Sequence, residues 1–229
     1  MNDVSSLEKK IKITFKNKNY LQQAMVHRSY LNEHPDFPLG HNERLEFLGD
    51  AVLELVVTEY LYLNYDNPEG DLTNWRASLV NSRMLARISD KLNINEHLYL
   101  SKGEARDEDS KARQYILANA CESLIGAIYL DQGWDVSKQF ITEHILSNLQ
   151  AILDGELYLD PKSKFQEAAQ EHYSVTPSYR VLEETGPDHS KKFVVGVFLG
   201  NEKVATGEGS SKQEAQVAAA QAAIEKKSW

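Results

Sequence analysis

The feature that most constrains the fold is a change of hydrophobic periodicity after Asp154-Gly155. Before this point, apolar residues recur three or four positions apart, which is the spacing of amphipathic helices. Asn42 and Asp71 are suitable N-cap residues, and the polar segment Ser101–Arg113 is predicted to be a mobile loop. The first part of the chain is therefore predicted to be all-α, with helices at Leu7–Ile13, Lys18–Met25, Asn42–Leu63, Asp71–Leu92, Lys111–Asp131 and Val136–Leu153.

After the change, the pattern favours a small α+β domain. Three β-rich runs are separated by Gly-, Pro- and Asn-containing turns and flanked by two helical segments. The expected elements are a helix at Lys162–His172, strands at Ser178–Glu184, Lys192–Leu199 and Glu202–Glu208, and a helix at Ser211–Lys227. We predict a helical domain over residues 1–153, a linker over 154–160 and an α-β-β-β-α domain over 161–229.

Length and composition exclude several classes of protein. A chain of 229 residues is long enough to bury a core without disulfides. Its single cysteine, Cys121, excludes an intrachain disulfide and a Cys-rich zinc site, and favours the reducing cytoplasm. No apolar run is long enough to span a membrane, so no membrane association is expected.

The charge balance argues at first against a polyanionic partner. The chain carries 25 Lys and Arg against 34 Asp and Glu, a net charge of −9. Residues 1–159 contribute 16 against 24, and residues 160–229 contribute 9 against 10. A basic surface field, the usual sign of a nucleic-acid-binding protein, is therefore missing from the composition.

The most informative stretch is His41–Asp50, which opens the longest predicted helix. At about 100° per residue, Glu43, Glu46 and Asp50 lie within about 60° of one another, and Glu54 extends the same stripe. Apolar residues flank this stripe on nearly all sides, so the helix is expected to be buried and its carboxylates to need partners. A divalent cation would satisfy them. The alternative is a solvated acidic stripe.

A second apolar segment, Tyr115–Tyr129, carries two further oxygen ligands. Asn119 and Glu122 are three residues apart and share a helix face. Glu46, Asp50, Asn119 and Glu122 could together bind Mg²⁺, with Mn²⁺ able to substitute, because all four offer hard oxygen donors. The alternatives are a hydrogen-bonded core pair of Asn119 and Glu122 and, for Glu69 in the turn before Asp71, an ordinary exposed residue.

These motifs resemble those of bacterial ribonuclease III. The stretch Asn42–Ala51 matches the family signature, supported by Ala24–Ser29, Glu69–Asp71 and Glu122–Gly126. Asp160–Glu167 and Gly207–Lys212 match the family's double-stranded-RNA-binding domain. The resemblance covers nearly the whole chain, and it implies an all-α endonuclease domain followed by a small α+β double-stranded-RNA-binding domain.

The resemblance implies a homodimeric enzyme that hydrolyses both strands of duplex RNA and leaves short 3′ overhangs. Asp50 and Glu122 would be the catalytic pair, sharing the metal with Glu46. Glu43 and Glu69 would be auxiliary cleft residues, and Phe47 would pack across the dimer interface, with simple core packing as its alternative. Asn119 stands where the family often has Asp, which predicts retained activity with a higher metal requirement. No small-molecule cofactor is implied.

The resemblance also supplies residues for RNA recognition, which for duplexes depends on shape, 2′-hydroxyls and phosphates. Four lie on the first helix of the C-terminal domain, one in the loop between its first two strands and two at the start of its last helix. In this order they are Ser163, Gln166, Glu167 and Gln170, then His189, then Ser211 and Lys212. The alternative for Gln166 and Lys212 is plain solvent exposure. A few such donors would bind RNA without a basic surface.

Three hypotheses for function follow. The leading one is a Mg²⁺-dependent endoribonuclease that processes ribosomal RNA precursors and some messenger and transfer RNA transcripts. The second is a catalytically silent duplex-RNA-binding protein on the same fold. The third is an unrelated helical metal phosphohydrolase with an appended binding domain. Retention of Glu43, Glu46, Asp50, Glu69 and Glu122 favours the first.

Overall fold

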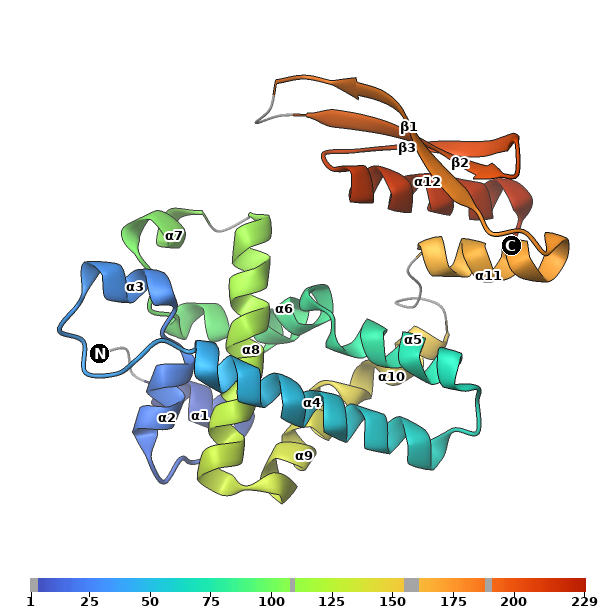
Figure 1. Cartoon of the computed structure of the whole chain (residues 1–229). Coiled ribbons are helices and arrows are strands. Elements are labelled where there is room, and N and C mark those ends of the chain that lie inside the picture. Colours follow the sequence, from blue (N-terminus) through green and yellow to red (C-terminus); the bar gives the residue numbers. More distant parts are fainter. Residues whose placement is uncertain (1–3, 108–109, 155–160, 188–190) are drawn as a thin grey trace. The chain divides into compact units, whose positions relative to one another are not determined.

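The computed structural model describes residues 4–107, 110–154, 161–187 and 191–229 (Figure 1). The chain divides into two compact units, Met1–Tyr158 and Leu159–Trp229. The expected linker 154–160 lies almost wholly outside the described residues, so the domain limits drawn from the sequence stay a prediction. No helix in the described part of the chain is long and apolar enough to cross a membrane.

In the residues that the structure describes, the elements of the first unit are all helices, as predicted, apart from one isolated β-bridge between Val26 and Tyr99. Its two longest helices, α4 and α8, pack against each other and are surrounded by the shorter ones (Figure 1). The elements are α1 (Ser5–Ile11), α2 (Lys18–Ala24), α3 (Arg28–Glu33), α4 (Glu43–Asn64), α5 (Glu69–Val80), α6 (Ser82–Lys91), η1 (Ile94–His97), α7 (Lys102–Arg106), α8 (Lys111–Gln132), α9 (Trp134–His144), η2 (Leu146–Asn148) and α10 (Leu149–Leu153).

Two predicted helices are in fact broken. The segment Asp71–Leu92 forms α5 and α6, because Asn81 has an extended backbone and its side chain accepts a hydrogen bond from the Met84 amide at 2.9 Å. This is the geometry of a helix N-cap. The segment Val136–Leu153 forms α9, the short 3-10 turn η2 and α10. Apolar periodicity continues through both breaks, so periodicity did not reveal them.

The loop predicted at Ser101–Arg113 was wrong over most of its length. Ser101 caps the short helix α7, and Ser110 caps α8, each through its side-chain oxygen. The expected N-caps also differ. The side chain of Asn42 donates to the Ala24 carbonyl at 3.2 Å instead of capping α4. Helix α5 begins at Glu69, which places Asp71 inside its first turn.

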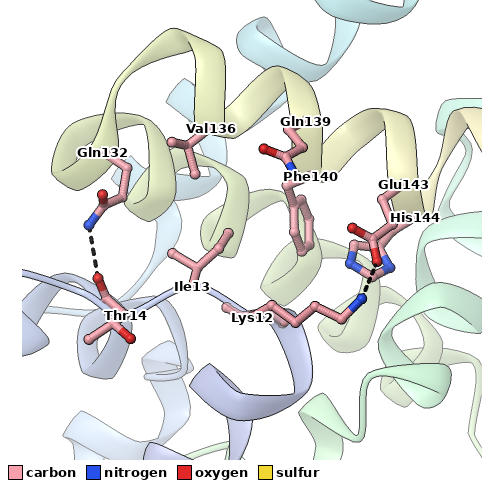
Figure 2. A pocket seen from close by; sticks show the side chains of 10 residues that line it. Lys12, Ile13, Thr14, Gln132, Val136, Gln139, Phe140, Glu143 and His144 are labelled. Carbon is pink, nitrogen blue, oxygen red and sulfur yellow. Dashed lines mark hydrogen bonds and ion pairs between the residues drawn. The ribbon is translucent and has the colours of Figure 1, made fainter.

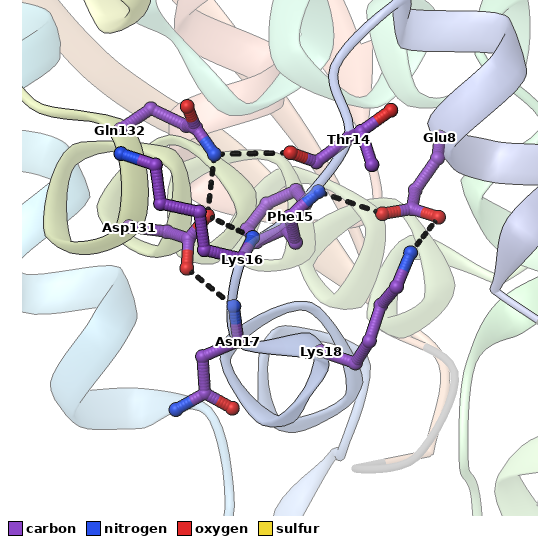
Figure 3. A network of polar contacts seen from close by, with 8 residues as sticks. All are labelled: Glu8, Thr14, Phe15, Lys16, Asn17, Lys18, Asp131 and Gln132. Atoms are coloured by element: carbon purple, nitrogen blue, oxygen red, sulfur yellow. Dashed lines mark hydrogen bonds and ion pairs between the residues drawn. The ribbon is translucent and has the colours of Figure 1, made fainter.

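The N-terminal segment is fastened to the end of α8 by a polar network (Figure 3). The Asp131 carboxylate accepts hydrogen bonds from the backbone amides of Lys16 and Asn17, both at 2.8 Å. Buried Glu8 accepts from the Phe15 amide at 2.8 Å and pairs with the Lys18 ammonium group. Backbone and side-chain donors thus satisfy two carboxylates, and the bonds to Asp131 tie the segment after α1 to the C-terminal end of α8.

The second unit has the α-β-β-β-α order that the sequence predicts. It consists of α11 (Pro161–Tyr173), β1 (Ser178–Thr185), β2 (Lys192–Leu199), β3 (Glu202–Gly209) and α12 (Lys212–Lys227), with the strands antiparallel in the order β1-β2-β3. Phe165, Val197 and Val204 pack with the alanines of α12 to form its core. A Cβ at Gly207 would lie 2.1 Å from the Ala219 amide nitrogen, so only glycine allows β3 to approach α12 this closely.

Candidate active site at the crossing of α4 and α8

Two glycines allow α4 and α8 to touch backbone to backbone. A Cβ built on Gly49 would lie 1.8 Å from the carbonyl oxygen of Glu122, and one built on Gly126 would lie 2.2 Å from the carbonyl oxygen of Leu45. Any larger residue at either position would separate the helices. The crossing point therefore lies beside Glu46 and Asp50 on α4 and beside Glu122 on α8.

The start of α4 is anchored to its neighbours, which fixes the carboxylate stripe. The Asn42 amide nitrogen donates to the Val26 carbonyl at 2.9 Å. The Ser123 hydroxyl, next to Glu122, donates to the Asn42 carbonyl at 3.3 Å. These contacts join Asn42, the residue before α4, to the segment that follows α2 and to α8, so the two halves of the site are held by backbone as well as side-chain hydrogen bonds.

Electrostatic coupling shows that the acids of the two helices share one region. Burial, followed by the negative charges of Asp50, Glu46 and Glu54, raises the pKa of Glu122 to about 8. Burial and the charge of Glu43 also raise the pKa of Glu46, while a hydrogen bond from Asn119 opposes this shift. Asp50 and Glu46 therefore lie within electrostatic range of Glu122, and Asn119 lies within hydrogen-bond range of Glu46. The assignment of these four residues to one metal site stays a prediction.

The donor set of this region fits a hard cation. Its members are carboxylate oxygens and the Asn119 amide, without sulfur or imidazole, which suits Mg²⁺ or Mn²⁺ and not zinc. Mutual repulsion among the carboxylates is the penalty that a bound cation would remove. Among the described residues, no group of three or more His, Cys, Asp or Glu side chains is placed so that it could hold a metal ion, and Glu46, Asp50 and Glu122 are therefore not gathered into one in this structure.

Arginines pair with both ends of the carboxylate stripe, and the sequence did not predict this. The Arg28 Nη1 atom lies 3.4 Å from Glu43 Oε1, and the ring nitrogen Nδ1 of His41 lies 3.6 Å from Glu43 Oε2. At the other end, Arg76 Nε lies 3.1 Å from Glu54 Oε2. The only sequence signal was the position of Glu54 on the stripe, since contacts between separate helices depend on tertiary packing.

Glu69 is not part of this cluster within one chain. It begins α5 and accepts a hydrogen bond from Thr73 at 2.7 Å. Arg76, seven residues further along α5, pairs with Glu54. Helix α5 follows α4 after a short turn and runs back along it (Figure 1). Because Glu69 is the first residue of α5 and Arg76 already pairs with Glu54, Glu69 lies toward the C-terminal end of α4 and away from Glu46.

Phe47 is exposed on α4, with 81% of its surface accessible to solvent, so the core-packing alternative is wrong for this residue. Two further exposed residues, Ala51 and Leu55, follow it at intervals of four. At about 100° per residue, these three positions form an apolar strip within about 80° of arc, directly beside the acidic stripe.

The predicted RNA-contacting residues of the second unit are partly described. Gln166, Glu167 and Gln170 are exposed on α11, opposite buried Phe165 and Ala169. Ser211 caps α12 by accepting from the Glu214 amide at 3.1 Å. The ammonium of exposed Lys212 lies 5.7 Å from the centre of the Phe193 ring. His189 and the side chain of Ser163 lie outside the described residues.

A surface pocket of about 280 Å³ lies elsewhere in the first unit (Figure 2). It is formed by the segment after α1 together with the end of α8 and α9, and Lys12 and Glu143 pair at 3.0 Å along its side. No residue of the carboxylate cluster lines it. Its lining residues are Ile11, Lys12, Ile13, Thr14, Gln132, Val136, Gln139, Phe140, Glu143 and His144. The pocket is therefore not the candidate active site.

The fold and site define a class: a helical hydrolase unit with a carboxylate cluster, followed by an α-β-β-β-α nucleic-acid-binding unit. The family model described as Ribonuclease-III-like matches residues 17–149, and the model described as Double-stranded RNA binding motif matches residues 161–227. The chain belongs to the ribonuclease III family. Members of this family are double-strand-specific, metal-dependent endoribonucleases.

Relatives agree over nearly the full chain. "Ribonuclease 3" of Chloroflexus aurantiacus is 42% identical over 96% of this chain and 90% of its own length. "Ribonuclease 3" of Natranaerobius thermophilus is 43% identical over 98% of this chain and 96% of its own. Among solved structures, the ribonuclease III nuclease domain of Campylobacter jejuni is 39% identical, with a TM-score of 0.57, covering 64% of this chain and 98% of that domain.

Proposed function

We propose that this enzyme uses Mg²⁺ to hydrolyse both strands of duplex RNA, leaving short 3′ overhangs, and that it processes ribosomal RNA precursors and some messenger and transfer RNA transcripts. A cytoplasmic location is part of the proposal. One observation carries it: the Gly49–Gly126 crossing places Glu122 where the charges of Asp50 and Glu46 act on it.

Each residue of the cluster has a role in this proposal. Asp50 and Glu122 come from different helices and would hold the cation directly, with Glu46 as a third ligand and the Asn119 carbonyl oxygen as a fourth. Mg²⁺ bound there would stabilise phosphoryl charge and lower the pKa of a bound water. Glu43, at the N-terminal end of the stripe, would help to order the RNA or a second ion.

The second unit would contribute binding and not chemistry. Gln166, Glu167 and Gln170 present amide and carboxylate groups on one exposed face of α11, where they can reach 2′-hydroxyls in a minor groove. Ser211 and Lys212 at the N-terminus of α12 would meet a phosphate, helped by the helix dipole. By family resemblance, Ser163 and His189 complete this surface.

A homodimer would complete the site and cover the apolar strip of α4. Phe47, Ala51 and Leu55 form an exposed strip beside the acids, which a second copy would bury. Glu69, at the start of α5, lies near the C-terminal end of α4 and away from the cluster of its own chain, so it would serve a site only across such an interface. The Campylobacter jejuni structure is described as having flexibility in a region involved in dimer formation.

The substitution Glu122→Gln tests the catalytic assignment. We expect it to reduce cleavage of a labelled RNA hairpin in Mg²⁺ by about 10³-fold or more, because it removes a charged ligand from the metal. Binding of the same hairpin in Ca²⁺ should change less than twofold. Cleavage by gel assay and affinity by filter binding measure the two quantities.

The same assay separates the competing hypotheses. Binding without cleavage by the wild-type enzyme in Mg²⁺ would support the silent RNA-binding protein. Hydrolysis of small phosphate esters, regardless of duplex length, would support the unrelated phosphohydrolase. Full activity in Glu122→Gln would refute the metal site itself.

A further inference from the structure

The carboxylate stripe of α4 has an arginine at each end. Glu43 pairs with Arg28, which begins α3, and Glu54 pairs with Arg76, in the middle of α5. Eleven residues separate Glu43 from Glu54, which corresponds to about 16 Å along the helix axis. Glu46 and Asp50, the candidate metal ligands, lie between these two pairs.

Arg28 has an anchored backbone and a solvent-exposed side chain. On one side of it, the His27 amide donates to the Tyr99 carbonyl at 3.1 Å. On the other side, the Ser29 hydroxyl accepts from the Ser101 amide at 3.1 Å. The Arg28 side chain itself is 71% exposed and touches Glu43 at 3.4 Å. The start of α3 is therefore anchored while the guanidinium remains accessible.

Arg76 is held more tightly. Its Nε atom lies 3.1 Å from Glu54 Oε2, and its Nη1 atom donates to the Thr58 hydroxyl at 3.0 Å. Glu54 and Thr58 are four residues apart on the same face of α4. About a third of the Arg76 side chain is exposed, so its guanidinium is held against Glu54 and Thr58 and still meets solvent.

These two ion pairs serve more than local stability. Ion pairs between exposed side chains contribute little to folding, because water and salt screen them. In contrast, RNA approaching a row of carboxylates in a region of net charge −8 meets strong repulsion at every point that a metal does not neutralise. Guanidinium groups bind phosphate in a bidentate geometry, and an arginine can exchange a carboxylate partner for a phosphate.

We propose that Arg28 and Arg76 bind backbone phosphates of the RNA on the two sides of the scissile bond, with Glu43 and Glu54 orienting them in the free enzyme. They are positioning residues, and they supply local positive charge on an acidic nuclease unit. This inference rests on the proposed function, because it takes the carboxylate stripe as the place where RNA is cut.

The test is duplex binding by the full-length protein in Ca²⁺ at several KCl concentrations. We expect Arg28→Gln and Arg76→Gln each to weaken binding about three- to tenfold at 150 mM KCl. Each should also flatten the slope of log affinity against log salt by about 1, the signature of one lost phosphate contact. In Mg²⁺, KM should rise by the same factor while kcat changes less than twofold. Arg28→Lys and Arg76→Lys should restore the slope.

Lys138→Ala is the matched control. Lys138 on α9 also pairs with a glutamate of α4, Glu59, but that residue lies about 160° around the helix from Glu43. We expect the slope of log affinity against log salt for Lys138→Ala to equal that of the wild type. Unchanged slopes in Arg28→Gln and Arg76→Gln would overturn the proposal. It would also be overturned if these variants had lowered melting temperatures that Arg28→Lys and Arg76→Lys shared, because the arginines would then be structural. Because wild-type cleavage and Glu122→Gln are measured in parallel, failure of the proposed nuclease would be seen separately.

Discussion

Asn119 is the one neutral side chain among the acids at the crossing. It donates a hydrogen bond to Glu46 and lowers the pKa of that carboxyl group, against the effects of burial and of Glu43. An aspartate there would add a negative charge to the ligand set and raise its attraction for a cation. We expect Asn119→Asp to lower the Mg²⁺ concentration for half-maximal cleavage by about three- to tenfold, measured by metal titration at fixed RNA.

Without metal, Asn119→Asp should destabilise the fold, and this effect serves as the control. A further like charge beside Glu46 and Glu122 should lower the melting temperature in EDTA, and Mg²⁺ should restore it. Asn119→Ala should shift the metal requirement in the opposite direction. An Asn119→Asp enzyme with an unaltered metal requirement would show that Asn119 is not a ligand.

At the level of elements, the site depends on how closely α4 and α8 approach. At Gly49 an added methyl group would overlap the Glu122 carbonyl at 1.8 Å, and at Gly126 it would overlap the Leu45 carbonyl at 2.2 Å. Backbone atoms cannot rotate away as side chains can. We expect Gly49→Ala and Gly126→Ala each to lower the free energy of unfolding by about 3 kcal/mol or more, measured by urea unfolding, and to reduce cleavage strongly.

Gly70→Ala is the control for these two substitutions. Gly70 also lies in a helix, α5, but nothing is within 4 Å of the position that its Cβ would take. Alanine should therefore stabilise the fold by about 0.5–1 kcal/mol, through the lower conformational freedom of the unfolded chain. Wild-type stability in Gly49→Ala would mean that the helices do not touch at this point.

The helices themselves were largely predictable, but their ends and partners were not. Apolar spacing identified α4 and α8 because both are long and each buries a continuous apolar face. The expectation that α4 is buried on nearly all sides was wrong, because Glu43, Asp50 and the strip that begins at Phe47 are exposed. The apolar spacing continues without interruption past Asn81, where α5 ends and the Asn81 side chain caps the start of α6. The acids of the site could be selected by their spacing on α4. Arg28 and Arg76 could not, because each reaches Glu43 or Glu54 from another helix.

For the whole molecule, the net charge of −9 gave a misleading indication. Composition averages over the surface, whereas RNA contacts a few groups. Most of the excess acid is in the first unit, where the carboxylates of the stripe would bind a cation and the arginines at its ends would bind phosphate. The second unit is close to neutral, and Lys212 stands at the N-terminus of α12, where the helix dipole adds to its charge. Overall charge therefore does not exclude an RNA substrate when the charged groups are arranged locally.

Assembly is the last property that this arrangement predicts. The apolar strip of Phe47, Ala51 and Leu55 lies beside the acids of α4. Glu69, at the start of α5, lies away from the acids of its own chain. We expect Phe47→Asp to convert a dimer into monomers in sedimentation velocity, because burial of a charge in an apolar interface is strongly unfavourable. Cleavage should fall in parallel. Leu130→Asp, which changes an exposed apolar residue of α8 outside the strip, should leave the mass unchanged. A Phe47→Asp protein that sediments as the wild type would place the interface elsewhere and leave Glu69 without a role in cleavage.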